Sequence, residues 1–516
     1  MNKSFYKILS VVMCLILIFS SVFSVRVGAE DNFCGTDFPI IYIKGQGDTI
    51  VRVNESGETE QLYPVNIPVN DYLEVAKNNI DVLAKALVTQ EWTEFGNLIR
   101  DTMLPVFGKF ALGNDGKPTD GSYCEAEYFN THIDTTTVNG KYTTDQFLFR
   151  YDWRLDPYDI ADKLHEYIEN VLKETHSDHV GIVSRCLGCC VATAYMEKYD
   201  GEYVTDFVLY ASALNGVENC SKIFAGDLFL DSGAVERYVY DSSITPNKVY
   251  DELIKAFVSV FKSVYGIDLA CWAFNNVWQD IYIDILPQIL IKTYGTLPSY
   301  WSMVSDEDYI RAKNNVFHNQ DMTEWADFIK KIDDYHYNVQ VKAPEIFKEF
   351  TEKGIPVSNI TKYGFQTMPI FNPPDMLSDK NCSVYDASMG AKTSAIDSEL
   401  NQEYIDSVDS RFISPDKQID ASTCLFPERT WFIKNLMHND FPAEVNSLIC
   451  AIINSHGMTV DTDTNFPQYM VYSDGRLVPM TDENCETNQY KHTFSESLLT
   501  ILKNLFEIIK NFIKEL

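Results

Sequence analysis

A cysteine at an expected strand-to-helix junction is the clearest sign of chemistry in this sequence. Residues 179–199 read HVGIVSRCLGCCVATAYMEKY, an apolar run followed by small residues and then a helical pattern. The segment SRCLG has the spacing of a G-x-S-x-G turn, which places a nucleophile between a strand and a helix. Cys186 stands at the nucleophile position and Ser184 replaces the first glycine. Because the amides and dipole of a helix start lower a thiol pKa, the pattern predicts that Cys186 is a nucleophile.

A nucleophile that attacks a carbonyl group also needs backbone amides that stabilise the developing oxyanion. The amide of Leu187, directly after Cys186, is one expected donor. The loop KGQG follows an apolar strand expected at residues 40–43. We expect Gln46, in this loop, to supply the second amide of the oxyanion hole.

Short strands and helices alternate around these residues, which predicts an α/β fold with a mostly parallel sheet covered by helices on both faces. Two hairpins are also expected, one turning at Gly57 and one at the Asp-Gly pair near the C-terminus. The expected strands lie within residues 40–43, 145–157, 179–186, 205–214 and 355–364; the helices within 71–87, 159–174, 190–199, 344–353 and 442–455; and the hairpins within 49–65 and 468–480.

The chain divides into six expected segments. Residues 1–29 combine two lysines, an apolar run and small residues before Ala29, which is the pattern of a cleaved export signal. Long helical segments rich in aromatic residues at 227–339 predict a helical cap inserted into the core. The other segments are the two parts of the core at 30–226 and 340–457, a hairpin region at 458–490 and an amphipathic helix at 491–516.

These motifs resemble those of the α/β-hydrolase superfamily, and within it the lecithin:cholesterol acyltransferase-like branch of lipid acyltransferases and phospholipases. IIYIKGQG stands where that branch has an apolar strand and a glycine-rich loop, RYDWRLDP resembles its YDWR-type motif, and VGIVSRCLGC stands at its nucleophile elbow. The resemblance covers residues 37–226 and 340–456. It implies an α/β-hydrolase fold in which the cap would be the lid.

The resemblance also implies the partners of the nucleophile, because the chain order in this superfamily is nucleophile, acid, histidine. SVYDASMGAKTSA stands where the family has its acid, which makes Asp386 the expected carboxylate. His438 lies in a loop just ahead of a helix, as the family's histidine does, unlike His456 and His492. The implied triad is Cys186, His438 and Asp386. Such a triad would form an acyl thioester that water resolves in a hydrolase and an alcohol resolves in an O-acyltransferase.

Charge and composition limit the partners of the protein. With 42 basic and 74 acidic residues the formal net charge is −32, and such a surface repels nucleic acid. We expect no cofactor and no metal ion, and a lipid or other small ester as substrate.

The tail has an apolar stripe with charges opposite, so it would dock on the protein itself, on a partner, or on a membrane surface through residues 494–516. The expected location is secreted or extracytoplasmic.

Other interpretations of the cysteine stay open at this point. Cys186 could be a buried thiol without chemistry, because free cysteine is among the most buried residue types. Cys186 and Cys189 form a C-x-x-C pair, as in thiol-disulfide redox proteins. An inactive hydrolase fold that serves as a binding protein is the third alternative. In the YDWR segment we expect Asp152 and Arg154 to form a structural ion pair.

Overall fold

The structure is a computed structural model that describes residues 35–485 except 66–74, 76–77, 90, 242–254, 256–257, 259–261, 263–264 and 282. The expected export signal at 1–29, the amphipathic helix at 491–516 and His492 lie outside the described residues. None of the helices that the structure describes is both long and apolar enough to cross a lipid bilayer.

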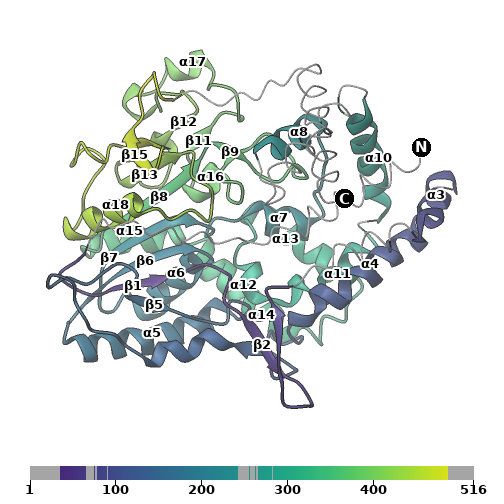
Figure 1. The fold of residues 1–516 in the computed structure, drawn as a ribbon, viewed down its shortest axis with the longest axis horizontal. Coiled ribbons are helices and arrows are strands. Elements are labelled where there is room, and N and C mark those ends of the chain that lie inside the picture. Colours follow the sequence, from purple (N-terminus) through teal and green to yellow (C-terminus); the bar gives the residue numbers. More distant parts are fainter. Residues whose placement is uncertain are drawn as a thin grey trace, which may run out of the picture.

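An eight-stranded sheet forms the centre of the molecule (Figure 1). Seven neighbouring strands run parallel, and β15 at one edge runs antiparallel to β14, which confirms the expected mostly parallel sheet. In spatial order the strands are β5 (Phe147–Phe149), β1 (Ile40–Ile43), β6 (Val180–Cys186), β7 (Val204–Ser212), β8 (Val357–Tyr363), β13 (Thr430–Lys434), β14 (Tyr469–Ser473) and β15 (Arg476–Pro479).

Helices cover both faces of this sheet because its central strands are apolar on both sides. In β6, Ile182 joins the core cluster on one face and Val183 joins the cluster on the other, as the alternation of side chains along a strand requires. The first cluster contains buried residues of α5 (Pro157–Thr175), α6 (Leu187–Tyr199) and α15 (Ala343–Glu352). The second contains those of α18 (Ala443–Asn454). All four helices were expected from the sequence.

The chain between β7 and β8 contains the region where a helical cap was expected. The described residues of this connection are mainly helical. Trp301 and Trp325 are buried in the main core, so these two aromatic residues serve packing, whereas Trp272 is 62% exposed. The helices are α7 (Glu218–Ala225), α8 (Ser232–Asp241), α10 (Gly266–Ile281), α11 (Leu286–Leu290), α12 (Pro298–Trp301), α13 (Asp306–Val316) and α14 (Ala326–Tyr335), followed by a π-helical turn at His336–Gln340 and then α15. The N-terminal helices α3 (Ile80–Thr89) and α4 (Thr93–Phe107) share a small apolar cluster with α11.

A second long excursion joins β8 to β13 and was not anticipated. It consists of short elements: β9 (Phe365–Gln366), β10 (Leu377–Ser378), α16 (Val384–Ala387), β11 (Lys392–Thr393), α17 (Gln402–Ile405) and β12 (Ile419–Asp420). β9 pairs with β10, and β11 pairs with β12, outside the main sheet. The strand that ends the excursion, β13, was also missed.

Both expected hairpins are present. β2 (Ile50–Val53) and β3 (Thr59–Tyr63) pair antiparallel around Gly57, whose φ of +82° favours glycine, and β4 (Tyr123–Cys124) joins them. Asp474 and Gly475 both have positive φ between β14 and β15, as a tight Asp-Gly turn requires. This second hairpin extends the main sheet, because β14 pairs with β13.

Candidate active site

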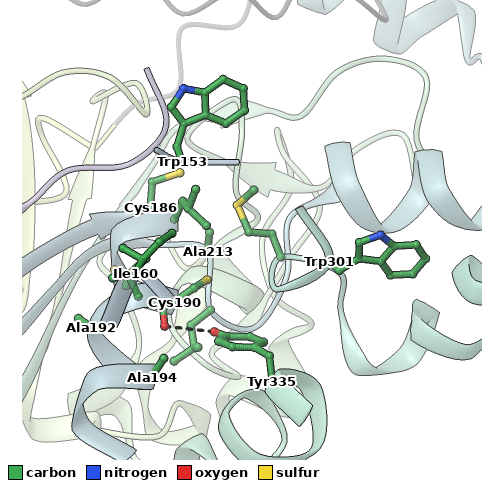
Figure 2. Close-up of a cluster of buried hydrophobic side chains, with 14 of the residues drawn as sticks. Trp153, Ile160, Cys186, Cys190, Ala192, Ala194, Ala213, Trp301 and Tyr335 are labelled. Carbon is green, nitrogen blue, oxygen red and sulfur yellow. Dashed lines mark hydrogen bonds between the residues drawn. The ribbon is translucent and has the colours of Figure 1, made fainter. Parts of the chain in front are cut away.

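Cys186 lies at a strained turn between β6 and α6. It is the last residue of β6, and its φ of 53° and ψ of −125° are unusual for a residue with a side chain. Helix α6 begins at the next residue, Leu187. The side chain is 8% exposed and belongs to the same main core cluster as Trp153 (Figure 2). The structure thus has the sharp strand-to-helix turn that the SRCLG spacing predicted.

Two glycines allow the chain to close around this turn. An added Cβ on Gly188 would lie 2.3 Å from the carbonyl oxygen of Ile43, so the start of α6 packs against the end of β1 too closely for any side chain. A Cβ on Gly45 would lie 2.8 Å from the Cβ of Cys186. The KGQG loop therefore runs directly against the cysteine, and its glycine makes that approach possible.

His438 and Asp379 form a buried pair beside Cys186. The Nδ1 atom of His438 lies 2.8 Å from an Oδ atom of Asp379, and the backbone amide of His438 donates to the carbonyl of Asp379 at 2.8 Å. The two residues are 4% and 0% exposed. The imidazole also lies close enough to Cys186 to lower the pKa of its thiol. Since Nδ1 faces the carboxylate, the other ring nitrogen is left for the sulfur.

Asp386, the carboxylate predicted for His438, has other partners, and the prediction is corrected to Asp379. Asp386 lies in the first turn of α16, where it accepts hydrogen bonds from the Ser383 hydroxyl at 2.6 Å and from the Asn215 amide at 3.2 Å. The physical reason is that His438 lies against the turn directly after β10. It does not lie against helix α16. The carboxylate that contacts His438 therefore lies four residues before the segment 383–395 that the resemblance indicated.

The electrostatics of the site favour a thiolate next to an imidazolium. Burial alone would raise the pKa of Cys186, but the charge and hydrogen bond of His438, the nearby Arg185 guanidinium and the Leu187 amide together lower it. Burial alone would lower the pKa of His438, but Asp379 and Cys186 together raise it. The two shifts have opposite directions, so each group stabilises the charged form of the other.

Backbone amides of the turn that begins at Asp379 stabilise the charged form of its side chain. Its second carboxylate oxygen accepts hydrogen bonds from the backbone amides of Asn381, at 3.0 Å, and Cys382, at 2.8 Å. Burial would raise the pKa of Asp379, but His438, then Lys362 and the Cys382 amide lower it below its usual range. Asp379 can therefore orient His438 and support its positive charge.

Of the two residues expected to form an oxyanion hole, Leu187 directly follows Cys186, and Gln46 follows Gly45, whose added Cβ would meet Cys186. The Leu187 amide lowers the pKa of the Cys186 thiol. The side chain of Gln46 is fixed by Tyr63, at 3.4 Å, and by the Tyr300 hydroxyl of α12, at 2.8 Å, so the helical insertion helps to hold this loop. That these two amides stabilise an oxyanion stays a prediction.

The YDWR segment, residues 151–154, forms hydrogen bonds to the chain just after β1, which packs against Cys186. The Tyr151 hydroxyl donates to the Lys44 carbonyl at 2.7 Å, and the Trp153 indole donates to the Asp48 carbonyl at 3.0 Å. Arg154 and Asp152 form a buried ion pair at 2.7 Å, as expected from the sequence. These contacts fix the chain just after β1. Gly45 and Gln46 lie in this part of the chain, and Gly45 packs against Cys186.

The other cysteines near the turn are not joined to Cys186. Cys186, Cys189 and Cys190 are separate free thiols. The Cys189 thiol donates to the Ser184 carbonyl at 3.2 Å, and burial raises its pKa to about 11. Ser184 is fully buried under the turn. The Cys190 carbonyl accepts from the Tyr335 hydroxyl at 3.4 Å (Figure 2). Only Cys186 thus has an environment that favours the thiolate among these three.

Metal-ligand atoms also come together at this site. One ligand atom each from Asp379, Cys382 and His438 lie within 4.8 Å of one another, a grouping that the sequence did not indicate. All three residues are buried, and burial raises the pKa of the Cys382 thiol well above its usual range. Since a thiol must lose its proton to bind a metal ion, and Asp379 and His438 already bond to each other, the arrangement suits the hydrogen-bonded pair better.

No protein-family profile matches the sequence, and no curated protein is similar to it.

Proposed function

We propose that this protein is an acyl-transferring enzyme of the α/β-hydrolase type, with Cys186 as nucleophile, His438 as base and acid, and Asp379 as the orienting carboxylate. The observation that carries the proposal is a buried His438–Asp379 pair near a cysteine at a strained strand-to-helix turn, where His438 lowers the pKa of the thiol. This is the arrangement of a nucleophile, a base and an orienting acid. The mostly parallel sheet flanked by helices is compatible with that fold.

The proposed reaction proceeds in two halves. The Cys186 thiolate attacks the ester carbonyl, and the oxyanion that forms accepts hydrogen bonds from the Leu187 and Gln46 amides. His438, as imidazolium, protonates the departing alcohol, leaving an acyl thioester on Cys186. His438 then takes a proton from water or from an acceptor alcohol, which attacks the thioester and releases the acid or a new ester.

The proposed substrate and location come from the sequence. The motifs resemble those of lipid acyltransferases and phospholipases, so the substrate would be a lipid-like ester. Residues 1–29 would direct export, and residues 494–516 would contact a membrane surface where such substrates lie.

Hydrolysis of p-nitrophenyl esters of several chain lengths tests this function. We expect the wild-type protein to release p-nitrophenol and Cys186→Ala to fall to the background rate. Cys189→Ala is the matched control, because it removes a buried thiol three positions away whose pKa burial raises. Equal rates for wild type and Cys186→Ala, or no release with any ester under reducing conditions, would contradict the proposal.

A further inference from the structure

Two cationic side chains, the buried Lys362 and the partly buried Arg185, hold the backbone of the turn that carries His438. Lys362, in β8, is 0% exposed, and its ammonium group donates to the carbonyls of Met437 at 2.7 Å, of His438, and of Asp440 at 3.3 Å. These contacts join the end of β8 to residues 437–440. An ammonium with three carbonyl partners is satisfied only while the turn keeps this shape.

The second cation comes from the nucleophile turn itself. Arg185, which directly precedes Cys186, donates to the His438 carbonyl at 3.0 Å and to the Asn439 side chain at 2.6 Å. The carbonyl of His438 therefore receives hydrogen bonds from both Lys362 and Arg185. One of these donors belongs to the nucleophile's own strand, so the positions of Cys186 and His438 are coupled through the backbone.

The surroundings of Lys362 show that its burial is costly for a positive charge. Its ammonium lies 4.5 Å from the centre of the Tyr210 ring, and the Tyr210 hydroxyl donates to the Asp440 carbonyl. Burial and the nearby Arg185 together lower the pKa of Lys362 to about 7, although the carboxylates of Asp379 and Asp440 oppose this shift. A buried lysine seldom increases the net stability of a protein. The hydrogen bonds from Lys362 to the turn therefore point to a role other than stabilising the fold.

We propose that Lys362 and Arg185 are positioning residues for His438, which hold the 437–440 turn so that the imidazole stays between Asp379 and Cys186. The inference rests on the proposed function, because it requires His438 to activate Cys186. Neither cation needs to touch substrate. Without the hydrogen bonds from Lys362 and Arg185 to the turn, the imidazole would move away from the sulfur. The thiolate would then lose its counter-ion.

The pH dependence of Cys186 alkylation by iodoacetamide, mapped to the residue by mass spectrometry, tests this role without requiring a substrate. In the wild type the inflection should lie below the usual range of a thiol, because the thiolate is the reactive form. Lys362→Met should raise the inflection by about one pH unit, so that the alkylation rate at pH 6 falls about tenfold. Asn439→Ala keeps the Arg185 charge but removes one anchor, and should raise the inflection by about half a unit.

Lys434→Met is the matched control. Lys434 is a buried lysine on the neighbouring strand β13, bonded to Asp416 at 2.9 Å and to the Cys485 carbonyl at 2.7 Å. Its substitution removes a buried ammonium group, as Lys362→Met does, and should leave the inflection unchanged. Equal shifts in both lysine variants, or none in Lys362→Met and Asn439→Ala, would overturn the positioning role. A wild-type inflection in the usual thiol range would instead overturn the proposed activation of Cys186.

Discussion

At the scale of single residues, the opposite pKa shifts of Cys186 and His438 are the central feature. The lowered thiol pKa and the raised imidazole pKa both shift the proton from sulfur toward nitrogen. Each shift favours a thiolate nucleophile and an imidazolium that can protonate the leaving group. Asp379 supports this state, because its carboxylate faces the ring nitrogen away from the sulfur.

The assignment of Asp379 gives a comparison between two aspartates of one segment. Asp379→Asn should lower kcat/KM for a p-nitrophenyl ester by about a hundredfold or more, since the amide cannot support the imidazolium charge. Asp386→Asn should keep the rate within about threefold, because Asp386 bonds to Ser383 and Asn215. Steady-state rates with matched melting temperatures give the measurement. The opposite order of the two effects would return the role to Asp386.

The sequence singled out Cys186, Leu187 and His438, which the structure places close together, but it did not single out Asp379, and the reason is local. Cys186 is marked by small residues at fixed spacing, and His438 by its place ahead of a helix. Asp386 lies in the segment where the acid was expected, residues 383–395, whereas Asp375 and Asp379 lie a few residues before it. Their order along the chain does not tell which one reaches His438; the backbone turn at 379–382, made by hydrogen bonds to the Asp379 side chain, decides it.

At the scale of elements, the long periodic segments were predictable and the short ones were not. Helix α5 and strands β6 and β7 show clear patterns, and they form as expected. β13 was missed because five residues, TWFIK, carry no distinctive period next to a loop-rich excursion. The β9–β10 and β11–β12 pairs have two residues per strand, and tertiary contacts rather than sequence pattern form them.

The contact between α7 and α16 predicts a pH-dependent stability. Burial and then the Asp386 carboxylate raise the pKa of Glu218 to about 8, from 4.5 in the unfolded chain. The folded state therefore keeps a proton that the unfolded state releases, and stability falls as pH rises from 4.5 to about 8. Glu218→Gln should match the wild type near pH 4 and be more stable at pH 8.5 by up to about 5 kcal/mol.

Urea unfolding of wild type and Glu218→Gln at several pH values measures this difference. Gln keeps the size of the side chain and cannot ionise, so the stability of the variant should depend less on pH. A wild type whose stability does not fall across this pH range relative to the variant would show that Glu218 is not held protonated.

At the scale of the whole molecule, the site gathers distant segments at one edge of the sheet. Gln46 follows β1, Cys186 ends β6 and His438 follows β13, so all three lie at the carboxyl ends of parallel strands, where α/β proteins commonly place their sites. The contact between Arg185 and His438 joins positions 253 residues apart. Sequence patterns predicted the sheet that makes such a contact possible, but not the excursion after β8 that adds Asp379.

Intact-mass spectrometry after brief incubation with an activated p-nitrophenyl acyl ester tests the central claim most directly. We predict one acyl adduct on the reduced wild-type protein, located on Cys186 by peptide mapping, with a matching burst of p-nitrophenol, and no adduct on Cys186→Ala. An adduct that persists in Cys186→Ala, or no adduct on the wild type with esters of several chain lengths, would contradict the account and favour a redox or binding role.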